Sequence, residues 1–389
     1  MVNINKVVIF IKKSKDFEND VKVEENISFS DKLQSKYKDL KSTKTIYTSI
    51  IYYLLVVCSM TLVLFWVVNT SQIENVKNII QLINVKSIVL IVIVCLLIVV
   101  MKSLKLFLTT YSKTKSKKFA RCYGFVVESE FYSGVTVNQR GRDISLIGGL
   151  LNKKTKNNIA INSVYGINIV NKIALISYFV VMLMLDLILN VKMVNLWLLL
   201  IAIIYILYNL LFVIFVFYAK KNKKSAIVFV GKLCKLLYKL KIIKDYEKVF
   251  SCMTDKLLYY TKSVENNKIL NIVNFCGEII CLMLKSIVLF LVVNMLGATN
   301  DFDIILIMFN ILVLDCCLGV IPIPNGIFVF EILFMVVFSN VFLNGYLFWV
   351  LLIYRLIITM FPLLHLIVVE LIRGIVNKIT MHKQKKRVV

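Results

Sequence analysis

The chain has 389 residues, of which 59% are hydrophobic, and its mean hydropathy of +0.82 excludes an ordinary soluble domain. Its formal net charge of +25 comes from lysines clustered between long apolar runs, without a nucleic-acid-binding pattern, so we expect no direct nucleic-acid partner. These properties predict an all-α, polytopic membrane helix bundle of about eight transmembrane helices, with one or two broken or re-entrant segments.

Residues 1–44 form a lysine-rich lead without a cleavable apolar core, which predicts a cytoplasmic segment and no signal peptide. An integral membrane domain follows over 45–376, and its first half covers about 45–219. Lys102 and Lys105 end the second span of this half, where long side chains can snorkel to the membrane surface. The spans predicted in the first half are 46–68, 87–108, 170–189 and 196–219.

Between the second and third spans, residues 144–151 carry Gly148-Gly149 in a mildly apolar patch. This pattern fits a re-entrant or interfacial segment and fits an ordinary cytoplasmic loop helix equally well. A basic amphipathic linker over 220–268 has apolar residues at helical spacing. Such a stretch lies on the inner leaflet or packs against the bundle.

The second half of the domain covers about 269–376, and residues 377–389 form a basic cytoplasmic tail. Lysine-rich loops and the tail fall on one side, which predicts a multi-pass protein of the bacterial cytoplasmic membrane with both termini in the cytoplasm. The spans predicted in the second half are 269–295, 304–318, 327–343 and 345–371.

The stretch 319–331 breaks an apolar run with two of the three prolines of the chain, Pro322 and Pro324. Asn325-Gly326 offers a turn and a helix start, and Glu331 follows. Broken backbone at membrane depth is tolerated when it is buried in protein or lines a cavity. A helix start also presents unpaired N–H groups, which suits a phosphate. The break therefore predicts a binding site.

Charged residues inside apolar spans cost about 2.5 to 3.5 kcal/mol each and should face protein or water. Asp186, His365 and Glu370 belong to this group. Arg355 can clamp a phosphate or a carboxylate, or can pair with an acid as a structural element. The residues predicted to bind substrate are Pro322, Pro324, Asn325, Gly326, Glu331, Arg355 and Asp315. The residues predicted to line a cavity are Glu278, Lys285, Arg142 and Asp143.

Each half contains four spans and an interruption after its second span, which suggests an internal duplication with a site between the repeats. No catalytic residue, metal site or cofactor is predicted. The nine cysteines include no CxxC pair, and the only histidines are His365 and His382.

The order Gly-x-x-Pro-x-Pro-x-Gly-x-x-x-x-Glu over 319–331, followed by Tyr354-Arg355 and Pro362, resembles the membrane domain of the lysylphosphatidylglycerol synthase/flippase family, the multiple peptide resistance factor group. Asn325 stands where that family commonly has glycine, Phe328 replaces a small residue, and the first-half motif is echoed only by Asn138, Arg142 and Asp143. Since about eighteen residues follow the eighth span, we expect no soluble transferase domain.

This resemblance implies a lipid translocase for an anionic or aminoacylated phospholipid such as lysylphosphatidylglycerol, linked to envelope charge and resistance to cationic peptides. Membrane phospholipid is then the expected partner. Two alternatives remain: a membrane subunit of a phosphatidylglycerol lysyltransferase system with a separate soluble aminoacyl-lipid transferase, and a non-transporting envelope scaffold. Assembly into a homo-oligomer is left undecided.

Overall fold

The computed structural model is helical throughout the part of the chain that it describes, without a strand there. This confirms the predicted all-α class. The described residues are 21–42, 49, 51–62, 81–114, 119–136, 140–152, 155–189, 195–264, 267–298, 304–321, 323, 326–339, 341–342 and 346–388.

Five of the described helices are long and apolar enough to cross a membrane, which identifies a helical membrane protein by length and composition. They are α5 (Val85–Thr114), α8 (Asn157–Leu189), α9 (Leu196–Lys221), α12 (Lys268–Leu296) and α15 (Tyr346–Val388). Four of them contain a predicted span, and α15 covers the span predicted at 345–371 except for residue 345, which lies outside the described residues.

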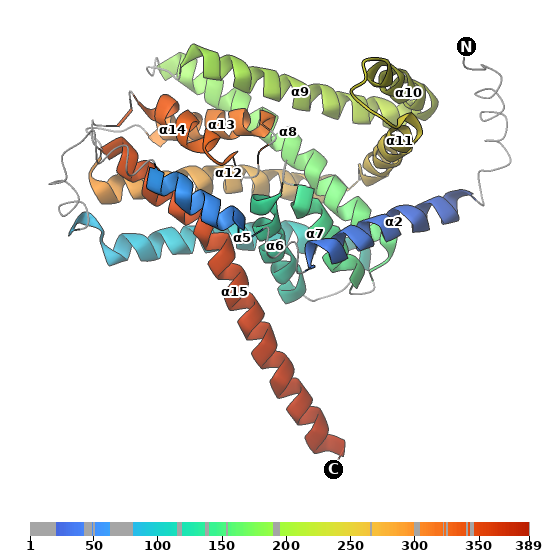
Figure 1. Cartoon of the computed structure of the whole chain (residues 1–389), viewed down its shortest axis with the longest axis horizontal. Coiled ribbons are helices and arrows are strands. Elements are labelled where there is room, and N and C mark those ends of the chain that lie inside the picture. The colour runs from blue at the N-terminus through green and yellow to red at the C-terminus, as the bar shows by residue number, and fades with distance from the viewer. Residues whose placement is uncertain are drawn as a thin grey trace.

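Three shorter apolar helices lie at the other predicted spans: Ile51–Leu62, α13 (Ile304–Val320) and α14 (Val329–Phe338). They are too short to count as spans by length alone. Figure 1 shows α12 crossing the middle of the bundle and α5 entering it from the lower left, while the carboxyl-terminal part of α15 projects away from it. Helices α5 and α12 pack against each other.

Two helices outside the long spans form a hairpin: α6 (Phe119–Val135) and α7 (Arg140–Asn152). The hairpin packs against α5 and α8. Gly148 and Gly149 do not interrupt α7, contrary to the predicted duplication, because the turn lies before Arg140. At Gly149 a Cβ atom would lie 2.6 Å from the Phe125 ring, so the glycine permits close packing against α6.

Basic segments surround this core. In the lead, α2 (Val21–Leu40) buries Leu33 and Tyr37. The linker forms α10 (Lys223–Lys239) and α11 (Tyr246–Ser263), which lie together beside α9 (Figure 1). Phe229 and Leu236 of α10 are more than half exposed, as expected for an amphipathic helix at a membrane surface.

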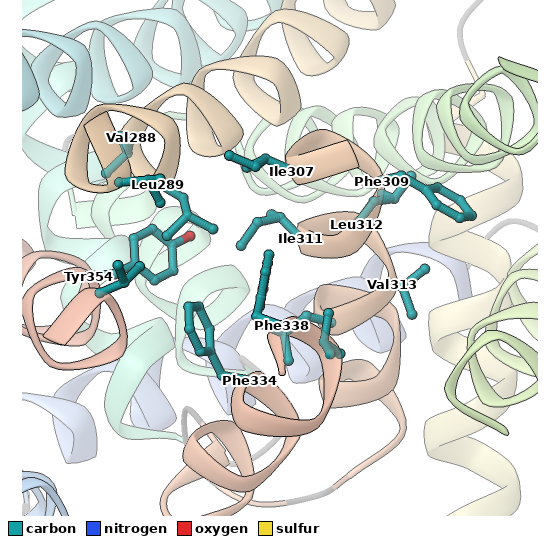
Figure 2. Packing of buried hydrophobic residues seen from close by; sticks show 14 of the residues in the cluster. Val288, Leu289, Ile307, Phe309, Ile311, Leu312, Val313, Phe334, Phe338 and Tyr354 are labelled. Atoms are coloured by element: carbon teal, nitrogen blue, oxygen red, sulfur yellow. The ribbon is translucent and has the colours of Figure 1, made fainter. Parts of the chain in front are cut away.

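The main apolar core lies where α12, α13, α14 and α15 meet. Figure 2 shows Val288 and Leu289 of α12 facing Ile307 and Ile311 of α13 and the rings of α14. In α14, Phe334 and Phe338 are fully buried and their ring centroids lie 4.5 Å apart. This packing fixes the position of α14 directly after the broken stretch.

The broken stretch is described only in part, and the predicted site residues Pro322, Pro324 and Asn325 lie outside the described residues. Both Gly326 (φ +64°) and Phe328 (φ +63°) have a positive φ, which is unfavourable for a phenylalanine. Helix α14 therefore begins at Val329, later than the predicted start near Asn325.

Candidate functional site

A cavity of about 630 Å³ lies between the central helices and has the size of a small-molecule site. Its wall includes residues of α5, α6, α7, α8, α9, α12, α13 and α15. Gly319, Ile321, Ile323 and Gly326 bring the broken stretch to the same space. Gly134 of α6, Thr136 directly after it and Arg142 of α7 also line it. The broken stretch therefore meets the α6–α7 hairpin at one cavity, whereas no residue of the predicted interruption at 144–151 lines it.

Charged side chains of both signs line this cavity, although most of the helices around it are apolar. Among the described lining residues, four are basic and four are acidic. They are Lys102, Arg142, Lys172 and Lys285, and Glu130, Asp143, Glu278 and Asp315. Because a charge in an apolar bundle is costly without a partner or water, such a concentration makes this cavity the candidate functional site.

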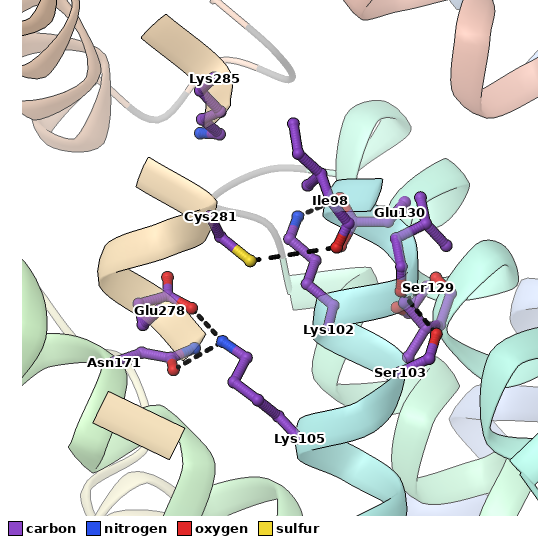
Figure 3. Close-up of polar contacts among 12 residues, drawn as sticks. Ile98, Lys102, Ser103, Lys105, Ser129, Glu130, Asn171, Glu278, Cys281 and Lys285 are labelled. Carbon is purple, nitrogen blue, oxygen red and sulfur yellow. Dashed lines mark hydrogen bonds and ion pairs between the residues drawn. The ribbon is translucent and has the colours of Figure 1, made fainter. Parts of the chain in front are cut away.

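Most of these charges are paired across helices (Figure 3). Lys102 Nζ of α5 lies 2.6 Å from Glu130 Oε2 of α6. Lys105 of α5 pairs with Glu278 of α12, and its Nζ also donates to Asn171 Oδ1 at 3.2 Å. Each pair therefore ties two or three helices together at the wall of the cavity.

A further pair links α12 and α13, where Lys285 Nζ lies 3.0 Å from Asp315 Oδ2.

The Glu130 carboxyl is ionised although it is buried. Burial opposes its ionisation, but the charges of Lys102 and Arg142 outweigh this effect and lower its pKa to about 2. Glu130 lies on α6, outside the five long apolar helices, and is a carboxylate at neutral pH.

Two basic residues of the cavity have no carboxylate hydrogen bonded to them among the described residues. Arg142 is close enough to Glu130 and Glu278 for their charges to stabilise its cationic form, yet its Nε atom has no hydrogen-bond partner among the described residues. Lys172 of α8 contacts the side-chain oxygen of Asn209 in α9, a neutral partner. Arg142 and Lys172 are thus the lining cations best able to accept an added anion.

Arg355 and Glu331 lie elsewhere. Arg355 is fully buried, its Nε donates to Glu331 Oε1 at 3.0 Å, and its guanidinium lies 4.3 Å from the Phe330 ring centroid. Ser59 also donates to Glu331 Oε1, at 3.4 Å. Neither Arg355 nor Glu331 lines the cavity, whereas their neighbours Phe330 and Tyr354 do. The pair therefore joins α14, α15 and helix Ile51–Leu62 beneath the cavity wall.

The structure thus brings several predicted residues together and separates others. Asp315 and Gly326, with the predicted cavity residues Glu278, Lys285, Arg142 and Asp143, line one cavity. However, the Gly326 N–H already donates to the Ile323 carbonyl at 3.1 Å, so this amide is occupied. Asp186 is buried away from the cavity, His365 lines it, and Glu370 pairs with Arg373.

Sequence reasoning missed several cavity residues, and the prediction for two lysines was wrong. Lys102 and Lys105 do not snorkel to a surface, because Lys105 is 2% exposed and both are paired inside the bundle. Lys172, Glu130 and Asn209 were not predicted. A signal was present for Lys172 and Asn209, which interrupt the apolar spans 170–189 and 196–219.

A glycine of α13 controls the packing at the cavity wall. A Cβ atom at Gly319 would lie 2.5 Å from the Tyr205 ring of α9. We expect Gly319→Ala to displace that ring and lower stability by about 1–3 kcal/mol. The matched variant is Gly134→Ala in α6, where a Cβ atom meets nothing within 4 Å. Thermal unfolding in detergent should separate the two, and equal midpoints would contradict the close contact.

In comparisons with protein-family models, with curated proteins and with solved structures, nothing matched this chain.

Proposed function

We propose that the chain is a lipid translocase that moves an anionic or aminoacylated phospholipid head group through the charged cavity. The observation that supports this proposal is the concentration of paired charges around a cavity of about 630 Å³ inside an apolar helical bundle. A head group needs such a polar path, whereas its acyl chains can stay among the exposed apolar side chains of the long helices.

The equal number of basic and acidic lining residues favours a head group that carries both signs. Lysylphosphatidylglycerol fits this requirement, since its phosphate is anionic and its lysyl amines are cationic. In this proposal, Arg142 and Lys172 hold the phosphate, and Glu278 or Asp315 receives an amine. Glu331 orients Arg355 beneath the wall, through the bond between Arg355 Nε and Glu331 Oε1.

The finer topology belongs to the same proposal. Eight spans with both termini in the cytoplasm place the lysine-rich lead, the linker and the tail on one side of a bacterial cytoplasmic membrane. The resemblance of 319–362 to the lysylphosphatidylglycerol synthase/flippase family supports the choice of lipid. Two glycines of the motif that carries this resemblance, Gly319 and Gly326, line the cavity.

Reconstitution into vesicles with labelled phosphatidylglycerol or labelled lysylphosphatidylglycerol tests this function. We expect Arg142→Gln to slow lipid movement at least about tenfold, because the lost charge-assisted contact is worth about 1.5–3 kcal/mol. Exposed Lys232→Gln on α10 is the control and should leave the rate unchanged. A folded Arg142→Gln variant with the normal rate would reject the role of Arg142. Wild-type protein that moves neither lipid would reject the translocase.

A further inference from the structure

The two central helices share a stretch of sequence. Residues 102–108 read Lys-Ser-Leu-Lys-Leu-Phe-Leu, and residues 285–291 read Lys-Ser-Ile-Val-Leu-Phe-Leu. Lys102 is the eighteenth residue of α5, and Lys285 is the eighteenth residue of α12. The serines that follow, Ser103 and Ser286, are both buried and each donates to the carbonyl four residues earlier. The stretches therefore match in sequence, in helix position and in local hydrogen bonding.

The next helices match in the same way. Helices α6 and α13 each have 17 residues and end in an acid-x-x-x-Gly-Val pattern. Glu130 and Asp315 are the twelfth residues, and Gly134 and Gly319 are the sixteenth. All four line the cavity. This match aligns α5–α8 with α12–α15, whereas the duplication predicted from span order aligned the span at 46–68 with the span at 269–295.

The matching residues also make matching contacts. Lys102 pairs with Glu130, and Lys285 pairs with Asp315, so each first helix holds its second helix through the same lysine–carboxylate bond. An acid near the start of the third helix then contacts the fourth. Asp143 of α7 accepts a hydrogen bond from Asn168 of α8, and Glu331 of α14 accepts one from Arg355 of α15.

The two units run in opposite directions. Cys281 Sγ of α12 lies 4.0 Å from the Ile98 carbonyl of α5, whereas Glu278, three residues earlier, pairs with Lys105, seven residues later. Helices α5 and α12 are therefore antiparallel neighbours, as in an inverted repeat whose axis passes between them. Equivalent residues of the two units then face opposite ends of the bundle.

We infer that α5–α8 and α12–α15 are two inverted copies of one unit, and that Lys102–Glu130 and Lys285–Asp315 are equivalent half-sites. Their lysines contact the phosphate of a head group in turn, before and after Arg142 and Lys172 hold it. The two pairs differ in exposure as alternation requires. The Lys102 and Glu130 side chains are 12% and 23% exposed, whereas those of Lys285 and Asp315 are 41% and 35% exposed. Both pairs line the same cavity, and the Lys285–Asp315 pair is the more exposed within it. Only the choice of a phosphate head group rests on the proposed function.

Thiol labelling tests the alternation without any lipid transport. Ser133 and Leu318 are the fifteenth residues of α6 and α13, and both line the cavity. In full-length protein with its native cysteines replaced and its unfolding midpoint retained, we expect Leu318→Cys to react faster than Ser133→Cys with a membrane-impermeant reagent. The reason is that the Lys285–Asp315 pair of α13 is more exposed than the Lys102–Glu130 pair of α6. In sealed vesicles, the two positions should become accessible from opposite sides.

The ion pairs provide matched variants for the same assay. Glu130→Gln should release the less exposed half-site and raise the labelling of Ser133→Cys about fivefold. Asp315→Asn, the equivalent change in the other unit, should not raise it. Equal effects of the two changes, or labelling of both positions from one side, would overturn the inverted repeat. This result does not depend on whether the protein moves lipid.

The ligand part has its own measurement. Glycerophosphoglycerol, the soluble head group of phosphatidylglycerol, should slow the labelling of Leu318→Cys, whereas glycerol should not. Equal protection by inorganic phosphate would assign the half-site to a free phosphate instead of a lipid head group. If neither phosphate compound protects Leu318→Cys, the half-site does not bind an anion. The labelling of Ser133→Cys and Leu318→Cys without a ligand then still decides the alternation.

Discussion

Replacing Arg355 by methionine should lower the free energy of unfolding by about 3–5 kcal/mol, because the change leaves the Glu331 carboxylate buried without its cation. Arg355 is fully buried and the Glu331 side chain is 5% exposed. Its guanidinium also contacts the Phe330 ring, so the loss includes a cation–π contact. The measurement is denaturation of purified protein in mixed micelles, followed by tryptophan fluorescence.

A double variant distinguishes the loss of a charge partner from the loss of packing. Arg355→Met combined with Glu331→Leu removes both charges and should recover most of the lost stability, as for other buried ion pairs replaced by apolar side chains. If the double variant is no more stable than Arg355→Met alone, the Arg355 side chain contributes mainly through other contacts. The ion pair would then not be the element that holds α14 against α15.

Lys105→Met should have the second large effect and lower the free energy of unfolding by about 3–5 kcal/mol, because it leaves the Glu278 carboxylate in the cavity wall without its cation. Lys105 joins three helices through Glu278 of α12 and Asn171 of α8. The exposed pair Arg373–Glu370 is the matched control, because both side chains are at least one-third exposed. Arg373→Met should change stability by no more than about 1 kcal/mol.

Unfolding in mixed micelles again measures the effect of Lys105→Met. Adding Glu278→Gln to Lys105→Met should restore part of the loss, because the amide has no charge to bury. An equal loss for Arg373→Met and Lys105→Met would mean that burial does not determine the strength of these pairs. The buried Lys105–Glu278 pair and the exposed Arg373–Glu370 pair would then contribute equally to the free energy of unfolding.

The helical class and the charged spans could be predicted because burying charge in an apolar run is costly wherever it occurs. Glu278, Lys285 and Asp315 stand out in the sequence for this reason, and all three line the cavity. Lys102 and Lys105 could not be recognised in the same way. They precede a basic segment, so the sequence alone does not distinguish a lysine at a membrane surface from one enclosed by α6 and α12.

The break at 319–331 could be predicted because prolines and glycines disrupt a helix wherever they occur. The acidic partner of Arg355 could not be predicted, because it depends on how the helices pack. The sequence predicted that Arg355 can pair with an acid, without showing which acid. Packing assigns Glu331 to Arg355 and Asp315 to Lys285. The cations of the cavity consequently come from α5, α7, α8 and α12, and their convergence follows from tertiary structure that no single span encodes.

The balance of charge around the cavity bears on how the membrane potential would act on a lipid in the proposed translocase. A wall with four basic and four acidic residues contributes little net charge of its own, so the potential would act chiefly on the charge of the lipid. That force amounts to about 2.3 kcal/mol per elementary charge for each 100 mV. Phosphatidylglycerol, with one negative charge, and its lysyl derivative, with one net positive charge, would therefore be driven in opposite directions through the same cavity.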